Sequence, residues 1–407
     1  MMTKKDSRDT RRIMQDLKLN LLLEVTKGIN SNFSTEQLLG IYEDFLKNQL
    51  NIGELILYVN DSGWKRFLKY GVGEDFKDID VEKELLHINE ISTFGLSANS
   101  AGRAFEIIIP VFHKSNPLAY VLLGDLEEKL EMSPAIKHLP FIQTLTNIIV
   151  VAIENKKMAK ESVRQAALKK ELELASEMQN MLFPSTLPQN EKIDMAAFYL
   201  PHSQVGGDYY DYIHRNENEF VFCMADVSGK GMSAALLMSN FQANLRALSN
   251  TDYPLKELVK ELNLKVVASA KGEKFITLFI GKYDLRSRKL TYINSAHNPP
   301  VLLNGNSVEL LKTGSTGLGM FDELEKVQEG VIEIKPGSTL VCYTDGLVEL
   351  ENEEKEEFGT EFLSLIVKNN RHLNSHELNQ HIINQAIKFK GTKPYVDDIA
   401  ILTCRIF

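Results

Sequence analysis

The chain has 407 residues, more than one hydrophobic core usually serves, so its length predicts two or three domains. A hydrophobic fraction of 43% and a charged fraction of 25% are typical of soluble globular proteins and exclude collagen-like or low-complexity chains. A net charge of −9 argues against binding of nucleic acid or anionic lipid through the overall electrostatic field.

The N-terminal third is expected to combine helices with a small antiparallel sheet. Residues 14–50 carry apolar side chains at helical spacing and predict two helices. Strand-like runs follow, separated by turn-rich segments at residues 60–63 and 113–117, and a long helix is expected from near Pro140. The strands expected are Glu54 to Val59, Trp64 to Tyr70, Phe105 to Phe112 and Ala119 to Leu123. This order predicts an α+β module of the size used for ligand sensing or dimerisation.

The same order resembles a GAF domain, with Ile108 to Val111 and Leu118 to Asp125 ahead of a terminal helix. The resemblance implies a GAF-like sensor domain over residues 18–153, after an N-terminal segment of residues 1–17. The sequence offers no cysteine for a bilin and no obvious haem ligand. A dimerisation module without a ligand is therefore an equal alternative.

Residues 154–184 are expected to form a helical linker. Glu154 to Met181 contains no Pro or Gly and is rich in strong helix formers, so one continuous helix is expected, ended by Pro184 and Pro188. Apolar residues recur at spacings of three and four, which suits a short coiled coil or a helix lying on a neighbouring domain. They are Leu168, Leu172, Ala175, Met178 and Leu182. The linker could transmit a signal or could be a spacer.

The C-terminal part, residues 185–407, changes to many short strands with helices between them. The strands expected include Phe220 to Ala225, Phe275 to Tyr283, Lys289 to Ile293, Pro300 to Leu303, Val331 to Ile334, Ser338 to Tyr343 and Ile399 to Ile406. The helices expected are Met232 to Ser249, Leu255 to Ala270, Phe362 to Asn369 and Ser375 to Lys388. Two sheets covered by helices, an α-β-β-α sandwich, would accommodate this order.

Acidic residues of the C-terminal part fall beside small residues at the ends of apolar strands. They occur in Val205-Gly206-Gly207-Asp208-Tyr209-Tyr210-Asp211, Ala225-Asp226-Val227-Ser228-Gly229-Lys230-Gly231, Tyr343-Thr344-Asp345-Gly346-Leu347 and Val396-Asp397-Asp398-Ile399-Ala400. Strand ends bring distant residues to one rim, and neighbouring glycines let backbone approach closely. Carboxylates gathered there would repel one another unless a cation neutralised them, and oxygen ligands select Mg²⁺ or Mn²⁺.

Two such ions can activate a water and clamp a phosphoryl group for in-line attack, which is hydrolytic chemistry without a protein nucleophile. Each motif alone is also typical of an ordinary turn. Their order, however, resembles that of the PPM-type metal-dependent protein phosphatases, most closely the SpoIIE-like bacterial branch that regulates sigma-factor control proteins. The resemblance runs from about Ala175 and includes Ala175 to Pro184, Asn294 to Pro300 and Leu318-Gly319-Met320.

The resemblance implies roles for individual residues of this chain. Asp226 would bridge two metal ions, with the Val227 carbonyl as a further ligand. Asp345 and Asp397 would complete one metal site, and Asp208 would act on the second metal, directly or through a water. Asp208 and Asp226 are thus the expected catalytic residues, and the cofactors expected are two Mn²⁺ or Mg²⁺ ions.

Several neighbours keep two interpretations. Asp211 and Asp398 could assist the metal site or could cap turns. Lys230 could steer a phosphate or could be solvated, and His297 could be a general acid or could hold its loop. The related family commonly has glycine where this chain has Ala296, a departure expected to affect only local backbone freedom.

The function expected is that of a protein serine/threonine phosphatase, regulated by the GAF-like domain. The resemblance implies a phosphorylated protein substrate, plausibly a STAS-type anti-anti-sigma factor, and a homodimer formed through the GAF-like domain and linker is expected. The alternative is a catalytically silent, metal-gated scaffold that binds partners. Neither nucleic acid nor membrane is an expected partner.

Location is judged from targeting signals and cysteines. Residues 1–12 carry charges of both signs and no apolar stretch follows, unlike a secretory signal. The longest uncharged run, Leu139 to Ile153, is too short to span a bilayer. Cys223, Cys342 and Cys404 lie in apolar runs without metal-ligand spacing and are expected to be reduced core residues. A cytoplasmic protein is therefore expected.

Overall fold

The chain divides into two compact units, Met1–Ala166 and Ala167–Phe407. The structure is a computed structural model that describes residues 4–73, 76, 78–93, 105–113, 115–126, 138–251 and 253–407. Met1 to Thr3 of the expected N-terminal segment and Lys114 of the expected 113–117 turn lie outside these residues. The dividing point falls inside the helix α4 (Leu139–Asn180), so the linker expected at residues 154–184 is shared between the units.

Unit 1 is a five-stranded antiparallel sheet with helices, and its strand order is β2-β1-β5-β4-β3. Its elements are α1 (Lys4–Asn30), α2 (Thr35–Asn48), β1 (Ile52–Asn60), β2 (Trp64–Tyr70), α3 (Val81–Glu84), β3 (Ser92–Thr93), β4 (Phe105–His113) and β5 (Asn116–Leu126). The start of α2 is fixed by a capping box, in which the Ser34 hydroxyl accepts the Gln37 N–H and the Gln37 side chain accepts the Ser34 N–H. Gly63, at φ +117°, closes the β1–β2 hairpin in the turn expected at residues 60–63.

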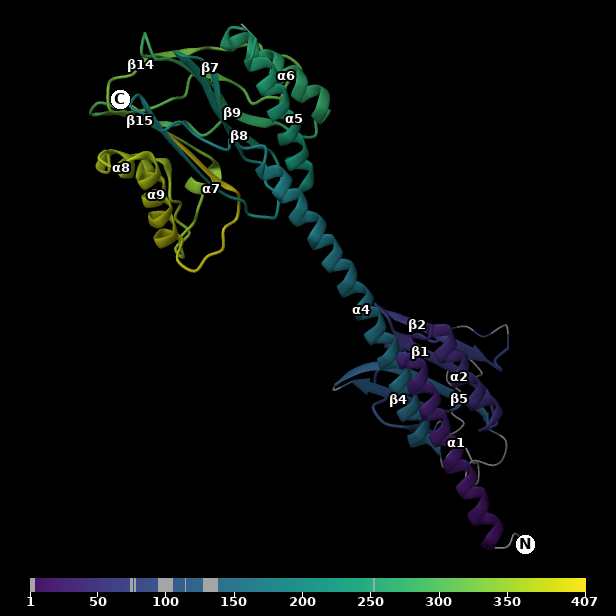
Figure 1. Ribbon diagram of the computed structural model, residues 1–407. Coiled ribbons are helices and arrows are strands. Elements are labelled where there is room, and N and C mark those ends of the chain that lie inside the picture. The colour runs from purple at the N-terminus through teal and green to yellow at the C-terminus, as the bar shows by residue number, and fades with distance from the viewer. Residues whose placement is uncertain are drawn as a thin grey trace. The chain divides into compact units, whose positions relative to one another are not determined.

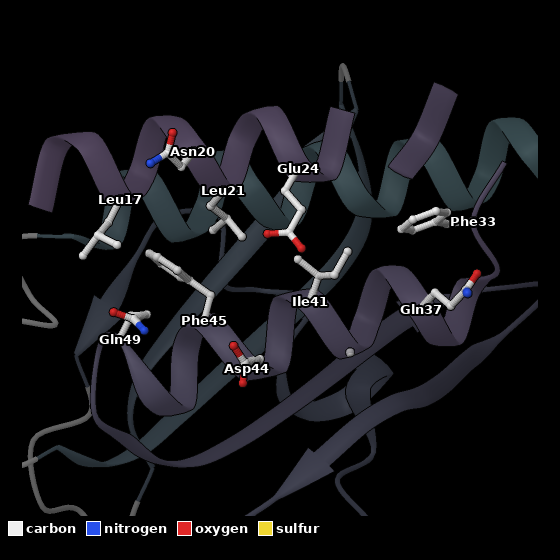
Figure 2. A pocket seen from close by; sticks show the side chains of 11 residues that line it. Leu17, Asn20, Leu21, Glu24, Phe33, Gln37, Ile41, Asp44, Phe45 and Gln49 are labelled. Atoms are coloured by element: carbon white, nitrogen blue, oxygen red, sulfur yellow. The ribbon is translucent and has the colours of Figure 1, made fainter. Parts of the chain in front are cut away.

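The main core of unit 1 lies between one face of this sheet and three helices. Side chains of α1, α2 and the first part of α4 pack together on that face (Figure 1). The Tyr42 hydroxyl of α2 lies 2.6 Å from the Thr146 hydroxyl of α4, a buried hydrogen bond that ties the two helices together. A groove of about 570 Å³ lies between α1 and α2. Figure 2 shows Leu21 of α1 on one wall and Phe45 of α2 on the other. The helix-and-sheet prediction for this part is confirmed, whereas the GAF resemblance stays a prediction.

Unit 2 contains two sheets. Its elements after α4 are β6 (Ile193–Leu200), β7 (Tyr209–Asn216), β8 (Glu219–Val227), α5 (Met232–Ser249), α6 (Leu255–Ala270), β9 (Ile276–Asp284), β10 (Lys289–Ser295), β11 (Val301–Asn304), β12 (Ser307–Leu310), β13 (Gly314–Ser315), β14 (Gly330–Glu333), β15 (Ser338–Tyr343), α7 (Asp345–Val348), α8 (Thr360–Asn369), α9 (Ser375–Lys390) and β16 (Ile399–Ile406). The first sheet has the order β13-β10-β9-β8-β7, with β14 also paired to β10, and the second has the order β12-β11-β15-β16-β6.

Alternation along the strands builds four layers in unit 2. In β8, Phe220 and Phe222 join the core between the two sheets, whereas Val221 and Cys223 join the core under α5 and α6. The far face of the second sheet is covered in the same way by α7, α8 and α9. Figure 1 shows α5 with α6 on one side of the paired sheets and α8 with α9 on the other. This is the α-β-β-α sandwich that the sequence predicts.

Some elements differ from expectation. The long helix near Pro140 and the linker helix are one continuous helix, α4, which ends at Asn180, before Pro184 is reached. Strands β6 and β7 were not predicted, because β7 carries Asp211 and several tyrosines where an apolar alternation would be expected. No helix in the described part of the chain is both long enough and apolar enough to cross a membrane.

Candidate metal centre

Two of the predicted ligands come from the first sheet of unit 2. Asp208 directly precedes β7, and Asp226 is the penultimate residue of β8. These strands are antiparallel neighbours in which Tyr209 lies opposite Ala225. Asp208 and Asp226 therefore emerge at the same end of the sheet.

The other two aspartates come from the second sheet. Asp345 begins α7 immediately after Thr344 and the end of β15, and Asp397 lies just before β16. Strands β15 and β16 are also antiparallel neighbours, with Tyr343 opposite Ile401. The Thr344 hydroxyl accepts the Ala400 N–H at 2.9 Å and holds the two strand ends together. Each sheet thus presents one pair of aspartates.

The two pairs face one another, because the Gly207 N–H beside Asp208 donates to the Asp398 carboxylate beside Asp397 at 2.7 Å. Burial, followed by the charges of Asp345 and Asp397, raises the pKa of Asp226 to about 7. Burial and the charge of Asp226 hold the pKa of Asp208 well above its usual range, opposed by a hydrogen bond from Thr344. Burial and the charge of Asp397 likewise raise the pKa of Asp345. The carboxylates repel one another across the gap between the sheets, and a bound cation would neutralise this repulsion.

Glycines permit the close approach on which this cluster depends. A Cβ atom placed on Gly207 would lie 2.9 Å from the Val227 carbonyl oxygen, and one placed on Gly346 would lie 1.9 Å from the Asp398 carbonyl oxygen. Neither position can accept a side chain without a shift of backbone. The glycine beside each of these aspartates is therefore a steric requirement of the site.

Comparison with known proteins identifies this part of the chain. The family model described as stage II sporulation protein E (SpoIIE) matches residues 216–407. Phosphoserine phosphatase RsbU of Bacillus subtilis is 29% identical over 191 residues, which are 46% of this chain and 56% of RsbU. The solved SiaA-PP2C domain of Pseudomonas aeruginosa shares the fold with a TM-score of 0.54 and 20% identity, covering 60% of this chain and 99% of that domain. Residues 216–407 match the SpoIIE family model and lie in a unit with the fold of a PP2C domain, and this part of the chain is called the SpoIIE-type domain below.

A further relative reaches beyond the SpoIIE-type domain. Protein IcfG of Synechocystis sp. is 23% identical over 329 residues, which are 72% of this chain and 52% of IcfG. The chain spans about half the length of the curated relatives it matches. Relatives of the SpoIIE-type domain are named phosphoserine phosphatase and PP2C, in agreement with the expected metal-dependent protein phosphatase.

The donor set of the SpoIIE-type domain suits hard divalent cations, although its side chains are not closed around an ion. Among the described residues, no three carboxylate, imidazole or thiolate groups stand close enough to hold a metal as they are placed. Asp208 nevertheless has a buried Oδ2 atom with no hydrogen-bond partner in the described structure. A buried carboxylate oxygen without a donor is costly, so this atom fits a metal or metal-bound water. The residues present fit a hard divalent cation such as Mg²⁺ or Mn²⁺.

Asp211 and Asp398 make hydrogen bonds that explain their burial. The Asp398 carboxylate accepts the His202 and Gly207 backbone N–H groups, each at 2.7 Å. Asp211 is fully buried and receives the Arg246 guanidinium at 2.8 Å and the Tyr209 hydroxyl at 2.5 Å. Asp398 therefore holds the loop before Asp208, as the turn-capping interpretation expects, whereas Asp211 ties β7 to α5 through Arg246.

Lys230 and His297 differ in their access to the centre. The half-exposed Lys230 ammonium lies 2.8 Å from the Asp397 carboxylate and also donates to the Val396 carbonyl. His297 is buried, its Nδ1 lies 2.8 Å from the Thr277 hydroxyl, and burial lowers its pKa to about 4. A neutral imidazole in the core favours the loop-holding interpretation over the general acid.

Ala296, the departure expected to affect local backbone freedom, adopts φ +56°, a conformation that favours glycine. Two other features of the SpoIIE-type domain escaped the sequence. The Tyr199 side chain lies near the centre. Burial, and then the charges of Asp398 and Asp208, raise its pKa. Gln179, in the last turn of α4, is buried and bonds to Gly206. The apolar residues around Gln179 mask it, so only a search for polar residues on the inner helix face could have found it.

Proposed function

We propose that the chain is a Mn²⁺- or Mg²⁺-dependent protein phosphatase that hydrolyses phosphoserine and phosphothreonine. The observation that carries the proposal is the meeting of two aspartate pairs, one from each sheet, where burial and the neighbouring charges raise the pKa values of Asp208, Asp226 and Asp345. The relative RsbU, named a phosphoserine phosphatase, supports the reaction class.

In this proposal the residues have separate roles. Asp226, on which the charges of Asp345 and Asp397 act, would be the ligand common to both ions, with the Val227 carbonyl as a neighbouring ligand. Asp345 and Asp397 would complete one ion's site, and Asp208 would hold the other ion directly or through water. When bound, two divalent ions would supply an activated water and neutralise the phosphoryl charge. The half-exposed Lys230 ammonium beside Asp397 would be placed to attract a phosphate.

Substrate and regulation extend the proposal. The substrate would be a phosphorylated regulatory protein, plausibly STAS-type, in sigma-factor control. Residues 18–153 would form a GAF-like regulatory domain, 154–184 a helical coupler and 185–407 the phosphatase domain, acting as a homodimer. The similarity to IcfG, which takes in more of the chain than the phosphatase domain, supports a conserved arrangement of the parts.

The test is hydrolysis of a phosphoserine peptide by the full chain in Mn²⁺, in Mg²⁺ and in EDTA. We expect turnover in either metal, none in EDTA, and none in Asp226→Asn. Asp284→Asn is the matched control, because Asp284 lies at the opposite end of the same sheet and caps a turn through backbone N–H groups that an asparagine also satisfies.

The outcomes separate the two candidate functions. Equal turnover in wild type and Asp226→Asn would contradict the assigned role of Asp226. A folded wild-type protein without turnover in either metal would instead favour the metal-gated scaffold.

A further inference from the structure

We propose that Gln179 is a positioning residue that sets the metal affinity of the centre by holding the loop that carries Asp208. The proposal rests on the metal-dependent function above and assigns a specific task to the last turn of α4. Gln179 touches neither substrate nor metal ligand directly. It acts through Gly206, two residues before Asp208.

The contact is a pair of hydrogen bonds to a single residue. The Gln179 side-chain N–H donates to the Gly206 carbonyl at 2.7 Å, and the Gln179 side-chain oxygen accepts the Gly206 N–H at 3.1 Å. Both distances are those of ordinary hydrogen bonds. One planar amide therefore satisfies both backbone groups of Gly206 and fixes the orientation of the peptide planes on either side of it.

Gln179 makes this contact in the protein interior rather than on the surface. Gln179 is 7% exposed, whereas its neighbour Met178 on the same helix is 70% exposed. Nearby, the Phe183 ring packs on Tyr199 and Tyr210 with centroid separations of 4.9 Å each. The end of α4 is thus anchored in the core of unit 2, and a buried amide there requires partners.

Gly206 itself has no freedom to carry a side chain. A Cβ atom at this position would lie 2.0 Å from the Tyr199 hydroxyl and 2.3 Å from the Asp398 carboxylate. The loop before Asp208 is therefore held by hydrogen bonds from two elements. Asp398 holds the Gly207 N–H from the start of β16, and Gln179 holds Gly206 from α4.

The next residue is Asp208, whose buried Oδ2 has no partner in the described structure. Besides its hydrogen bond from Thr344, the two peptide units just before Asp208 set the direction of its side chain. Residues that orient metal ligands from behind typically change metal affinity by about 10–100-fold when removed. Loss of the Gln179 amide should therefore weaken metal binding while leaving the ligands themselves in place.

The experiment compares Gln179→Met with Gln242→Met in the full chain. Gln242 is also buried, at 8% exposure, and its side chain donates to the Leu182 carbonyl just after α4, but it makes no bond to the Asp208 loop. The two variants thus remove the same amide from the same neighbourhood. Mn²⁺ affinity is measured by calorimetry, thermal stability by unfolding in EDTA, and phosphopeptide turnover across a Mn²⁺ titration.

We expect the Mn²⁺ dissociation constant of Gln179→Met to rise by about ten-fold, with turnover returning near the wild-type value at saturating Mn²⁺. Gln242→Met should keep the wild-type dissociation constant even where its melting temperature falls equally. An unchanged dissociation constant in Gln179→Met, or an equal rise in Gln242→Met, would overturn the proposal.

Two further outcomes are assigned in advance. If the wild type binds Mn²⁺ without turnover, the phosphatase proposal fails and the dissociation constants still decide the role of Gln179. If the wild type binds no Mn²⁺, both proposals fail. Should Gln179→Met not fold, Gln179→Asn, which keeps the amide one methylene short of Gly206, carries the same expectation.

Discussion

Two buried aspartates only three residues apart have opposite surroundings. Asp211 receives the Arg246 guanidinium, the Tyr209 hydroxyl and the Tyr212 N–H, so its charge is compensated within the protein. Asp208 keeps an oxygen without a partner in the described structure and lies against other carboxylates. A compensated carboxylate stabilises the fold, whereas one left uncompensated marks a place for an external cation. Partner count, rather than burial, separates the structural aspartate from the ligand.

His297 gives a prediction about acid stability. Its pKa is near 6.5 in an unfolded chain and about 4 in the buried site, so only the unfolded state takes up its proton between these values. The free energy of unfolding contributed by a neutral His297 is therefore present above pH 6.5 and is lost as the pH falls toward 4, by about 3 kcal/mol in total. Urea unfolding in EDTA at pH 7, 6, 5 and ~4.5, compared with His297→Gln, measures this loss.

The comparison with His297→Gln is needed because Asp226 and Asp345 change the free energy of unfolding in the opposite direction as the pH falls. The folded-state pKa values of Asp226 and Asp345 are raised, so their protonation favours the folded state as the pH falls. That contribution is common to both proteins and cancels in the difference. Parallel stability curves for wild type and His297→Gln would show that burial of His297 carries no such cost.

At the scale of elements, α4 has two kinds of surface. Near its end, Gln179 faces the core, whereas the apolar series Leu168, Leu172, Ala175 and Met178, spaced by three and four residues, is half-buried or exposed, with Leu168 and Met178 the exposed members. Exposed apolar residues at helical spacing are typical of a helix that pairs with another helix.

We therefore expect Leu168→Glu to weaken a homodimer of the full chain. Leu168 is 56% exposed, and burial of one leucine in each of two subunits is worth roughly 2 kcal/mol apiece, enough for at least about a ten-fold change in dissociation constant. Ala166→Glu is the control, because it adds the same charge on the other side of an ideal helix. Sedimentation velocity measures both, and a monomeric wild type, or equal association of the two variants, would contradict the homodimer.

At the scale of the whole chain, α4 belongs to both units, so it could transmit a structural change from one unit to the other. The helix starts in the core of unit 1 and ends in the core of unit 2, without a described break. A rigid helix can transmit a change only if it has two discrete arrangements at one of its ends. We propose the Gln179–Gly206 contact as the place where the two arrangements would differ.

Truncated chains separate the effect of Gln179 on metal affinity from regulation by unit 1. Residues 185–407 lack Gln179, so we expect them to bind Mn²⁺ about ten-fold more weakly than the full chain, as Gln179→Met does. Residues 167–407 keep Gln179 and should recover the affinity, and any remaining difference in turnover from the full chain then measures regulation by unit 1. Unchanged activity and metal affinity in residues 185–407 would rule out coupling through α4.

The sequence by itself determined the order of most elements and the four aspartate segments. Helices α5 and α6 occupy the expected residues, because local periodicity determines where they begin and end. The aspartates could be found because Asp226, Asp345 and Asp397 adjoin apolar strand runs and Asp208 and Asp345 adjoin a glycine, which are local signatures. The sandwich followed from the alternation of strands with amphipathic helices.

Only the tertiary structure decided which polar residues serve the centre. Asp398 bonds to His202 across 196 positions and Gln179 bonds to Gly206 across 27, and neither pairing leaves a local pattern. Strand β7 was missed for the same reason, because a buried Asp211 is tolerated in a strand only when Arg246 lies beside it. Local sequence fixes backbone conformation, whereas the burial of a polar group depends on a partner that only the folded chain brings within reach.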